Sequence, residues 1–297
     1  MISTWYRASR PFTLTASVVP VVAGSSLAFK DGQANLALFF LILLASMLVQ
    51  IGANLVDEYS DHLRPEGKRK LLAPYKVIAL GQLSPNSVRL GAVACFCIAI
   101  VVGVYIIFVS SWIILIVCVG GLAMAYFYAA GPRPLGSLGL GEPIVFVFMG
   151  PIIVLGTYYV HTGRVSLEGT MASMAIGCLV TSILVANNIR DKDEDLMSGK
   201  TTIITKLGSK FGNWLWGTLV FASYLLILMQ VLFGLSSVLL LIVLLSSATG
   251  LKAFRLISGG RDRVVQSMGL RESTVLHFRF GLLLSVGICI SKYVLPA

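Results

Sequence analysis

Residues 36–61, LALFFLILLASMLVQIGANLVDEYSD, contain the pattern on which the fold depends. The part from 36 to 55 is apolar and carries no charged side chain. Roughly 20 such residues are needed for a helix to cross about 30 Å of hydrocarbon. Three carboxylates, Asp57, Glu58 and Asp61, follow directly. The segment therefore predicts a transmembrane helix that ends in a cluster of acidic side chains at one membrane surface.

Eight further apolar segments of similar length recur along the 297 residues. The composition agrees, because only 12% of the residues are charged, whereas soluble domains carry about 25%. We therefore expect an all-α, polytopic membrane protein with nine transmembrane helices, in which residues 1–297 form one domain. The predicted spans are 13–29, 36–55, 88–109, 112–130, 142–159, 171–189, 214–233, 236–256 and 275–295.

Glycines inside these spans are expected to let neighbouring helices pack closely. Examples are Gly103, Gly120, Gly121 and Gly177.

The basic residues indicate how the chain is oriented. If the N-terminus is cytoplasmic and the nine spans alternate, only Lys30, Arg164 and Lys292 of the 23 Lys and Arg lie on the outer side. Such asymmetry is typical of the positive-inside rule. It predicts a multi-pass protein of the plasma membrane, and it accounts for the net charge of +10 without a nucleic-acid partner. No pattern in the sequence indicates an obligate protein partner.

The acidic residues are concentrated in two segments on the predicted cytoplasmic side. Seven of the 13 Asp and Glu follow the second and sixth predicted helices. An amide and two carboxylates recur there at intervals of three and four residues, which places them on one face of a helix. We interpret the segments as half-sites of a pseudo-repeat, near 54–61 and 187–195. The residues concerned are Asn54, Asp57 and Asp61, and Asn188, Asp191 and Asp195.

Two facing carboxylate clusters would repel each other unless a cation lay between them. Hard oxygen ligands favour Mg²⁺, which usually binds a few carboxylates together with substrate phosphates. Basic side chains close by could neutralise the remaining charge of a departing diphosphate. A single cluster could equally be a solvated helix end, and the matched pair favours the magnesium site. The basic candidates are Lys68, Lys76, Arg190 and Lys192.

Three stretches carry a resemblance to a known family: 10–13 (RPFT), 131–142 (GPRPLGSLGLGE) and 187–200 (NNIRDKDEDLMSGK). Over essentially its full length the chain resembles the UbiA superfamily of intramembrane prenyltransferases, and within it the 1,4-dihydroxy-2-naphthoate prenyltransferases of menaquinone biosynthesis. The resemblance implies nine helices around a central cavity, Mg²⁺ as cofactor, an isoprenyl diphosphate donor and an aromatic acceptor. It also implies an active site that faces the cytoplasm.

The resemblance further implies roles for individual residues. In the first motif Asp57 takes the place of the usual Asn and Glu58 that of the first Asp, so the metal coordination departs from the family pattern. The implied metal ligands are Asp57, Glu58, Asp61, Asp191 and Asp195. Other implied substrate-binding residues are Asn54, Asn187, Asn188, Arg190, Lys68 and Lys76.

Four more residues have two interpretations each. Glu142 could take a proton or orient the acceptor, or it could cap its own helix. Tyr128 could shield a carbocation with its ring face or belong to an interfacial aromatic belt. Arg10 and Arg133 could hold the acceptor's acid group or the diphosphate, or they could be ordinary membrane anchors.

Two other functions remain open from the sequence. One is prenyl transfer to another acceptor, such as 4-hydroxybenzoate, a different naphthoate, a haem or a lipid. The other is transport, because tandem helical halves also occur in transporters, whose sites lie near the bilayer midplane. Acidic groups on one side only argue against alternating access.

Overall fold

The computed structural model describes residues 2–63, 76–260 and 262–294, and every regular element among them is a helix. Eight segments of this described part are long and apolar enough to cross a membrane. The remaining predicted span, 112–130, corresponds to a shorter apolar helix of 17 residues. The predicted all-α membrane fold is therefore confirmed, with eight long spans and one short one.

The chain order is α1 (Ile2–Ala8), η1 (Pro11–Leu14), α2 (Thr15–Lys30), α3 (Leu36–Leu63), α4 (Pro85–Val109), α5 (Ile113–Ala129), η3 (Leu135–Ser137), α6 (Gly141–Val147), η4 (Phe148–Ile152), α7 (Ile153–Thr162), α8 (Leu167–Arg190), α9 (Lys192–Met197), α10 (Ile203–Leu232), η5 (Val238–Ser246), α11 (Ser247–Gly259) and α12 (Arg263–Val294).

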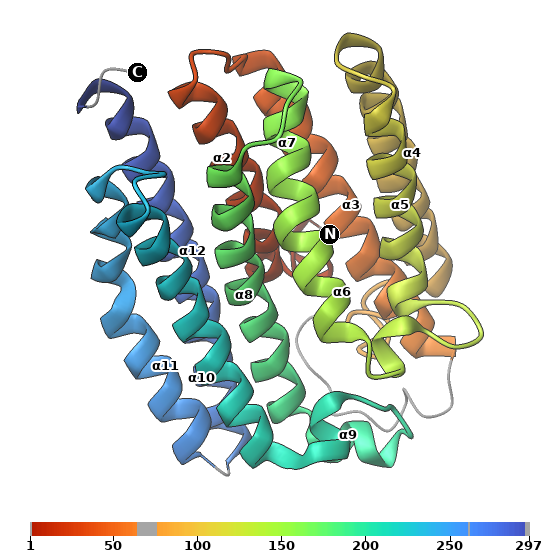
Figure 1. Cartoon of the computed structure of the whole chain (residues 1–297). Helices are drawn as coiled ribbons and strands as arrows, with labels where there is room; N and C mark the ends of the chain where they lie inside the picture. Colours follow the sequence, from red (N-terminus) through yellow and green to blue (C-terminus); the bar gives the residue numbers. More distant parts are fainter. Residues whose placement is uncertain (1, 64–75, 261, 295–297) are drawn as a thin grey trace.

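Helix α8 lies at the centre of the bundle. It packs against α10, α12, α6 and α2, and it is the most enclosed span, with 72% of its apolar window buried. Figure 1 shows α10, α11 and α12 on one side of α8, and α3, α4 and α5 on the other. The ends of α3 and α8 that carry the acidic segments, and the short α9, lie toward the same end of the bundle (Figure 1).

The buried side chains form two main clusters. The larger joins α2, α7, α8, α10, α11 and α12. The smaller joins α1, α3, α4 and the end of α5, with Val77 and Ile78. Because lipid tails are as apolar as Leu, such helices associate through close packing more than through the hydrophobic effect.

A close contact between helix backbones lies where the span 141–162 crosses α8. Pro151 cannot donate a backbone hydrogen bond, and the helix forms a π-helical turn, η4, at this point. A Cβ atom added to Gly150 would lie 2.6 Å from Cα of Gly177 and 2.7 Å from the carbonyl oxygen of Ser173. The packing role predicted for Gly177 is confirmed. It is wrong for Gly120 and Gly121, where an added Cβ would meet no atom of the described residues within 4 Å.

Polar contacts join the helices at the opposite end of the bundle. Lys30 Nζ lies 2.7 Å from Glu168 Oε2, and Arg164 Nη2 lies 2.8 Å from Asp31 Oδ2. Lys292 Nζ donates to the carbonyl oxygen of Phe29 at 2.9 Å. The three basic residues that the sequence places outside are thus all engaged in contacts between elements distant in the chain.

Candidate active site

A cavity of about 670 Å³ lies inside the helical bundle. Side chains of α2, α3, α4, α5, the span 141–162 and α8 line it, and most of them are apolar. The charged lining residues gather at the end of the cavity where α3 and α8 terminate. They are Arg10, Asp57, Asp61, Lys76, Asp191, Glu194, Asp195, Lys200 and Arg263. Both acidic segments therefore face one space.

Asp57 and Asp61 of α3 line the cavity, whereas Glu58 is only 2% exposed and points behind them. Glu58 Oε1 accepts a hydrogen bond from the backbone N–H of Ile78 at 3.1 Å. Lys76 Nζ donates to Asp61 and lies 3.4 Å from Glu58 Oε2. Glu58 therefore anchors the chain around Ile78, and the two aspartates are the cavity-facing carboxylates of this half-site.

Arg10 approaches the same half-site from the turn before η1. Its Nη2 lies 2.7 Å from Asp57 Oδ2. The backbone of Arg10 is left-handed, with φ 51° and ψ 65°. Such a conformation costs a non-glycine residue about 1 kcal/mol or more. Thr13, whose N–H and hydroxyl both donate to the carbonyl oxygen of Arg10 at 2.8 Å, helps to hold it.

The charges at this half-site act on Lys76. Burial lowers the pKa of Lys76, but the carboxylates of Asp57, Asp61 and Glu58 raise it by more than burial and Arg10 together lower it. The net pKa lies above the ordinary lysine value, so Lys76 is a cation at neutral pH.

The second half-site lies where the polypeptide passes from one helix to the next. Helix α8 ends at Arg190, and α9 begins at Lys192. Arg190 Nη2 and Nε donate to Asp191 at 2.6 and 2.8 Å, and Nη2 also donates to Asn187 Oδ1 at 2.7 Å. Lys200 Nζ lies 3.4 Å from Asp195 Oδ2. The expectation of one continuous helical face is wrong here, because the backbone turns at Asp191.

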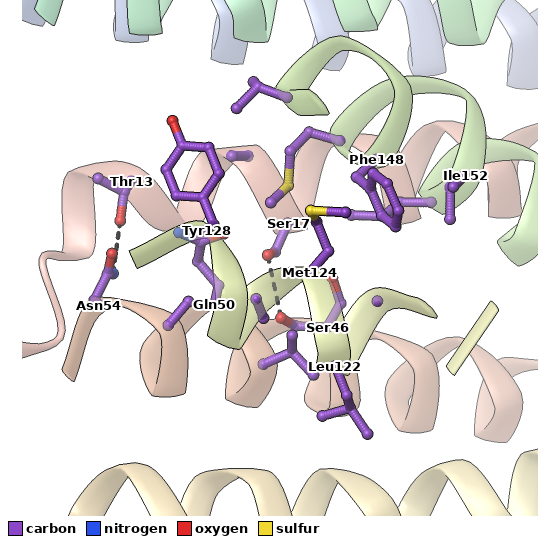
Figure 2. A pocket seen from close by; sticks show the side chains of 18 of the residues that line it. Thr13, Ser17, Ser46, Gln50, Asn54, Leu122, Met124, Tyr128, Phe148 and Ile152 are labelled. Carbon is purple, nitrogen blue, oxygen red and sulfur yellow. Dashed lines mark hydrogen bonds between the residues drawn. The ribbon is translucent and has the colours of Figure 1, made fainter. Parts of the chain in front are cut away.

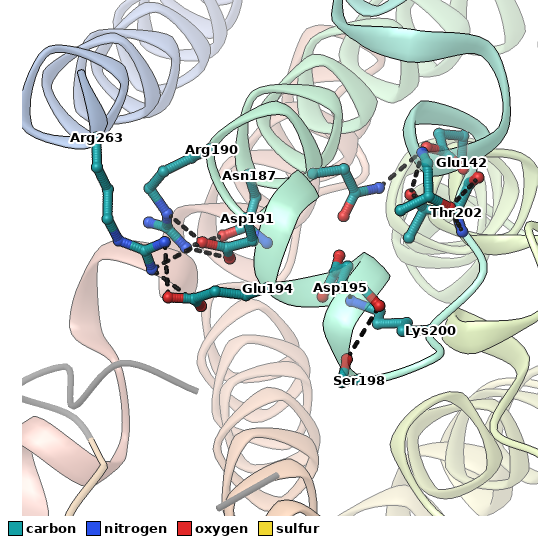
Figure 3. A network of polar contacts seen from close by, with 12 residues as sticks. Glu142, Asn187, Arg190, Asp191, Glu194, Asp195, Ser198, Lys200, Thr202 and Arg263 are labelled. Carbon is teal, nitrogen blue, oxygen red and sulfur yellow. Dashed lines mark hydrogen bonds and ion pairs between the residues drawn. The ribbon is translucent and has the colours of Figure 1, made fainter. Parts of the chain in front are cut away.

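A third element reaches this half-site. Arg263, the first residue of α12, places Nη1 2.8 Å from Glu194 Oε1 and Nη2 3.1 Å from Asp191 Oδ1 (Figure 3). Burial alone would raise the pKa of Asp191. The hydrogen bond from Arg190 and the positive charges of Arg190, Arg263 and Lys200 outweigh burial and hold this pKa below its ordinary value.

Glu142 and Asn188 lie beside the cavity and do not belong to its lining. Both are buried, and Asn188 Nδ2 donates to Glu142 Oε1 at 3.0 Å. They join α6 to α8 close to the second half-site (Figure 3). Asn187, not Asn188, is the amide of this motif that lines the cavity.

The remaining predicted residues that the structure describes are Asn54, Tyr128 and Arg133. Asn54 and Tyr128 line the cavity. Asn54 Nδ2 donates to the carbonyl oxygen of Ser9 at 2.8 Å and to Thr13 Oγ1 at 2.9 Å (Figure 2). Arg133 is exposed and outside the lining. Lys68 lies outside the described residues.

Glu194, Lys200 and Arg263 were not among the site residues expected from the sequence. Glu194 and Lys200 stand inside the quoted motif 187–200, so their proximity to the expected ligands was an available signal. No signal in the sequence pointed to Arg263, because the positive-inside rule already explains a basic loop residue on the predicted cytoplasmic side.

Within the described ranges no three His, Cys, Asp or Glu side chains gather into a metal-binding group. Each half-site instead holds its carboxylates against Arg and Lys. The donor set is nonetheless made of hard oxygens facing a shared space, which suits a cation bound together with a phosphate ligand.

Comparison with known proteins agrees with this geometry. Residues 17–268 match the model of the UbiA prenyltransferase family. The chain is similar to the 1,4-dihydroxy-2-naphthoate octaprenyltransferase of Bacillus subtilis, at 30% identity over 97% of this chain and 93% of that protein. It is also similar to the 1,4-dihydroxy-2-naphthoate octaprenyltransferase of Mycobacterium tuberculosis, at 34% identity over 69% and 70% of the two chains.

The fold is also that of a solved structure. A UbiA homologue from Archaeoglobus fulgidus, bound to DMAPP and Mg²⁺, superposes with a TM-score of 0.65 over 95% of this chain and 99% of that one, at 14% identity. The two acidic segments, the cavity that they share and the family match lead to one conclusion: this chain is an enzyme of the UbiA prenyltransferase family.

Proposed function

We propose that the enzyme transfers a polyprenyl group from a Mg²⁺-bound isoprenyl diphosphate to 1,4-dihydroxy-2-naphthoate, which yields demethylmenaquinone after oxidation of the product. The observation that carries the proposal is the two-part cavity, with charged groups of both half-sites at its mouth and a mostly apolar remainder. A diphosphate with a long hydrocarbon tail has the same two parts. The head would lie at the mouth and the tail along the apolar lining.

The residues present fit a magnesium diphosphate. Asp57, Asp61, Asp191 and Asp195 would hold the metal, and Glu194 lies on the same lining. Mg²⁺, when bound, would supply charge neutralisation for the departing diphosphate. Arg10, Lys76, Arg190, Lys200 and Arg263 now pair with these carboxylates and can turn to the phosphate oxygens.

Residues of this chain can assist each step of the prenyl transfer. The cations stabilise the diphosphate as the bond between its oxygen and the allylic carbon breaks. Tyr128 presents an aromatic side chain to the cavity and can shield the positive charge that develops on the allylic carbon. The electron-rich ring attacks the allylic carbon through the ring carbon that bears the carboxylate, and a carbon–carbon bond forms. The carboxylate then leaves as carbon dioxide, and the electrons of the broken bond restore the aromatic ring.

Separate observations support the identity of the acceptor and the orientation of the enzyme in the membrane. The naphthoate prenyltransferases of B. subtilis and M. tuberculosis supply the acceptor by similarity. The asymmetry of Lys and Arg supports a mouth that faces the cytoplasm from the plasma membrane. One-sided charge in the cavity also favours an enzyme over a transporter with alternating access.

The test is a competition assay with purified enzyme in lipid nanodiscs. Geranylgeranyl diphosphate and Mg²⁺ are supplied with equal amounts of 1,4-dihydroxy-2-naphthoate and 4-hydroxybenzoate, and products are identified by mass. We expect the prenylated naphthoquinone, carbon dioxide and diphosphate, all abolished by EDTA. Exclusive prenylation of hydroxybenzoate would overturn the acceptor assignment, and absence of diphosphate release with every acceptor would overturn the enzymatic proposal.

A further inference from the structure

Below the charged mouth, the cavity has a polar stripe formed by η1, α2 and α3. Thr13 of η1 and Ser17 of α2 face Asn54, Gln50 and Ser46 of α3, and all five line the cavity. Figure 2 shows Gln50 between the Thr13–Asn54 contact and the Ser17–Ser46 contact. The other lining residues at this depth include Leu122, Met124, Phe148 and Ile152, so the stripe is the polar side of an otherwise apolar space.

Most polar groups of the stripe bond to each other or to the backbone. Asn54 donates to Ser9 and Thr13, the Thr13 hydroxyl donates to the carbonyl oxygen of Arg10, and Ser17 Oγ donates to the carbonyl oxygen of Ser46 at 3.2 Å. Gln50 has a buried side-chain oxygen that differs from these groups. Its Oε1 atom is buried, and among the described residues none donates a hydrogen bond to it.

A buried carbonyl oxygen without a donor costs about 1–3 kcal/mol, so its donor is expected to come from a bound molecule. The prenyl tail is a hydrocarbon, and an ionised diphosphate offers only acceptors. A phenolic acceptor has hydroxyl groups that donate. Of the two proposed substrates, only the acceptor can therefore satisfy Gln50.

The position of Gln50 suits this role. It precedes Asp57 by two turns of α3, which is about 10 Å along the helix axis. A naphthalene ring placed between them would reach from a hydroxyl bonded to Gln50 to a carbon close to the diphosphate head. Tyr128 lines the same space from α5 and can pack against the flat face of the ring.

We infer that Gln50 forms the acceptor subsite, where its Oε1 accepts a hydrogen bond from a phenolic hydroxyl of the aromatic substrate. This inference rests on the proposed function and adds to it a residue that recognises the acceptor. Gln50 positions the ring and takes no part in bond making.

The experiment compares wild-type enzyme with Gln50→Met, which keeps the length of the side chain and removes the carbonyl. We expect KM for 1,4-dihydroxy-2-naphthoate to rise about five- to tenfold, while KM for geranylgeranyl diphosphate stays unchanged. Gln50→Glu, which keeps an oxygen acceptor, should recover part of the loss. Gln230→Met is the matched control, because Gln230 is a fully buried glutamine of α10 outside the cavity lining.

A second part of the experiment removes a hydroxyl group from the acceptor instead of the carbonyl group from the side chain of Gln50. Wild type and Gln50→Met are compared on 1-hydroxy-2-naphthoate and 4-hydroxy-2-naphthoate. The effect of the substitution should vanish with the analogue that lacks the bonded hydroxyl and persist with the other. An equal rise in KM with every acceptor, or a rise in KM for the diphosphate, would mean a structural role or a bound water and would overturn the inference.

The two proposals fail in different ways. If wild type prenylates the dihydroxynaphthoate and Gln50→Met shows no change in its KM, the acceptor subsite is wrong and the proposed function stands. If wild type prenylates none of these phenols, both are wrong.

Discussion

At the scale of single residues, the site consists of carboxylates held by cations. Asp57, Asp61 and Asp191 each have an Arg or Lys partner on a different element or at the end of their own helix. Buried carboxylates without such partners would be costly. Under the proposed function, the basic residues that pair with these carboxylates would also bind the diphosphate.

We expect Asp61→Asn and Asp191→Asn each to lower prenyl transfer about 100-fold or more, because each removes a proposed metal ligand that faces the cavity. Turnover is measured with labelled isoprenyl diphosphate, and folding by the thermal unfolding midpoint in detergent. Glu272→Gln is the matched control, since Glu272 pairs with Lys252 on the outer surface of the bundle. Near wild-type activity of either aspartate variant would contradict the two-half-site arrangement.

Arg263→Gln tests the contribution of α12. Loss of its contacts with Asp191 and Glu194 should raise KM for the isoprenyl diphosphate roughly tenfold. The Mg²⁺ concentration for half-maximal activity should also change. Arg255→Gln removes an exposed arginine of the neighbouring α11 and should leave both values unaltered. Equal behaviour of the two variants would remove Arg263 from the site.

At the scale of elements, hydropathy finds the membrane part of a helix and not its end. The predicted span 36–55 corresponds to α3, which continues to Leu63. The span 275–295 corresponds to α12, which already begins at Arg263. These extensions carry Asp57, Asp61 and Arg263 beyond the apolar part, so the sequence predicted the spans correctly but could not show which residues of their extensions meet.

Other features of the site depend on local backbone conformation and packing, which the spacing of residues in the sequence does not show. The sequence indicated that Asn188 belongs with Asp191, but the structure pairs Asn188 with Glu142 and turns Asn187 to the cavity. Both amides precede the break of α8 at Asp191, and they lie four and three residues before Asp191, so the spacing is compatible with either one facing the cavity. The contact of Asn188 with Glu142 of α6 decides between them. The left-handed backbone of Arg10 is likewise invisible in a pattern of residue types.

The crossing of η4 and α8 gives a prediction about an element. Gly150→Ala should lower the stability of the bundle by about 2 kcal/mol, because the added methyl group would overlap the backbone of α8. Gly120→Ala is the control, since it adds the same methyl group where no described atom lies within 4 Å. Thermal unfolding of both variants in the same detergent is the measurement, and equal midpoints would contradict the close contact.

At the scale of the whole molecule, the two acidic segments must lie on the same side of the membrane if they share a substrate. Reporters fused after Lys70, Lys200 and Arg263 should all report cytoplasm, and one fused after Arg164 should report the opposite side. The measurement is the activity of paired phosphatase and fluorescent-protein fusions. A cytoplasmic signal from the Arg164 fusion would contradict the proposed orientation.

The lining of the cavity also affects how easily ions could leak across the membrane. A water-filled mouth that penetrates far into a membrane brings the two aqueous phases closer together, and an energised membrane cannot tolerate a conducting path. Here the far part of the lining consists of side chains such as Ile42, Ile106 and Ile114, which exclude water and oppose the passage of ions. The apolar lining would thus act as an insulator as well as a tail-binding surface. An Ile114→Asp variant in proteoliposomes should dissipate an imposed proton gradient faster than wild type, as followed by a pH-sensitive dye.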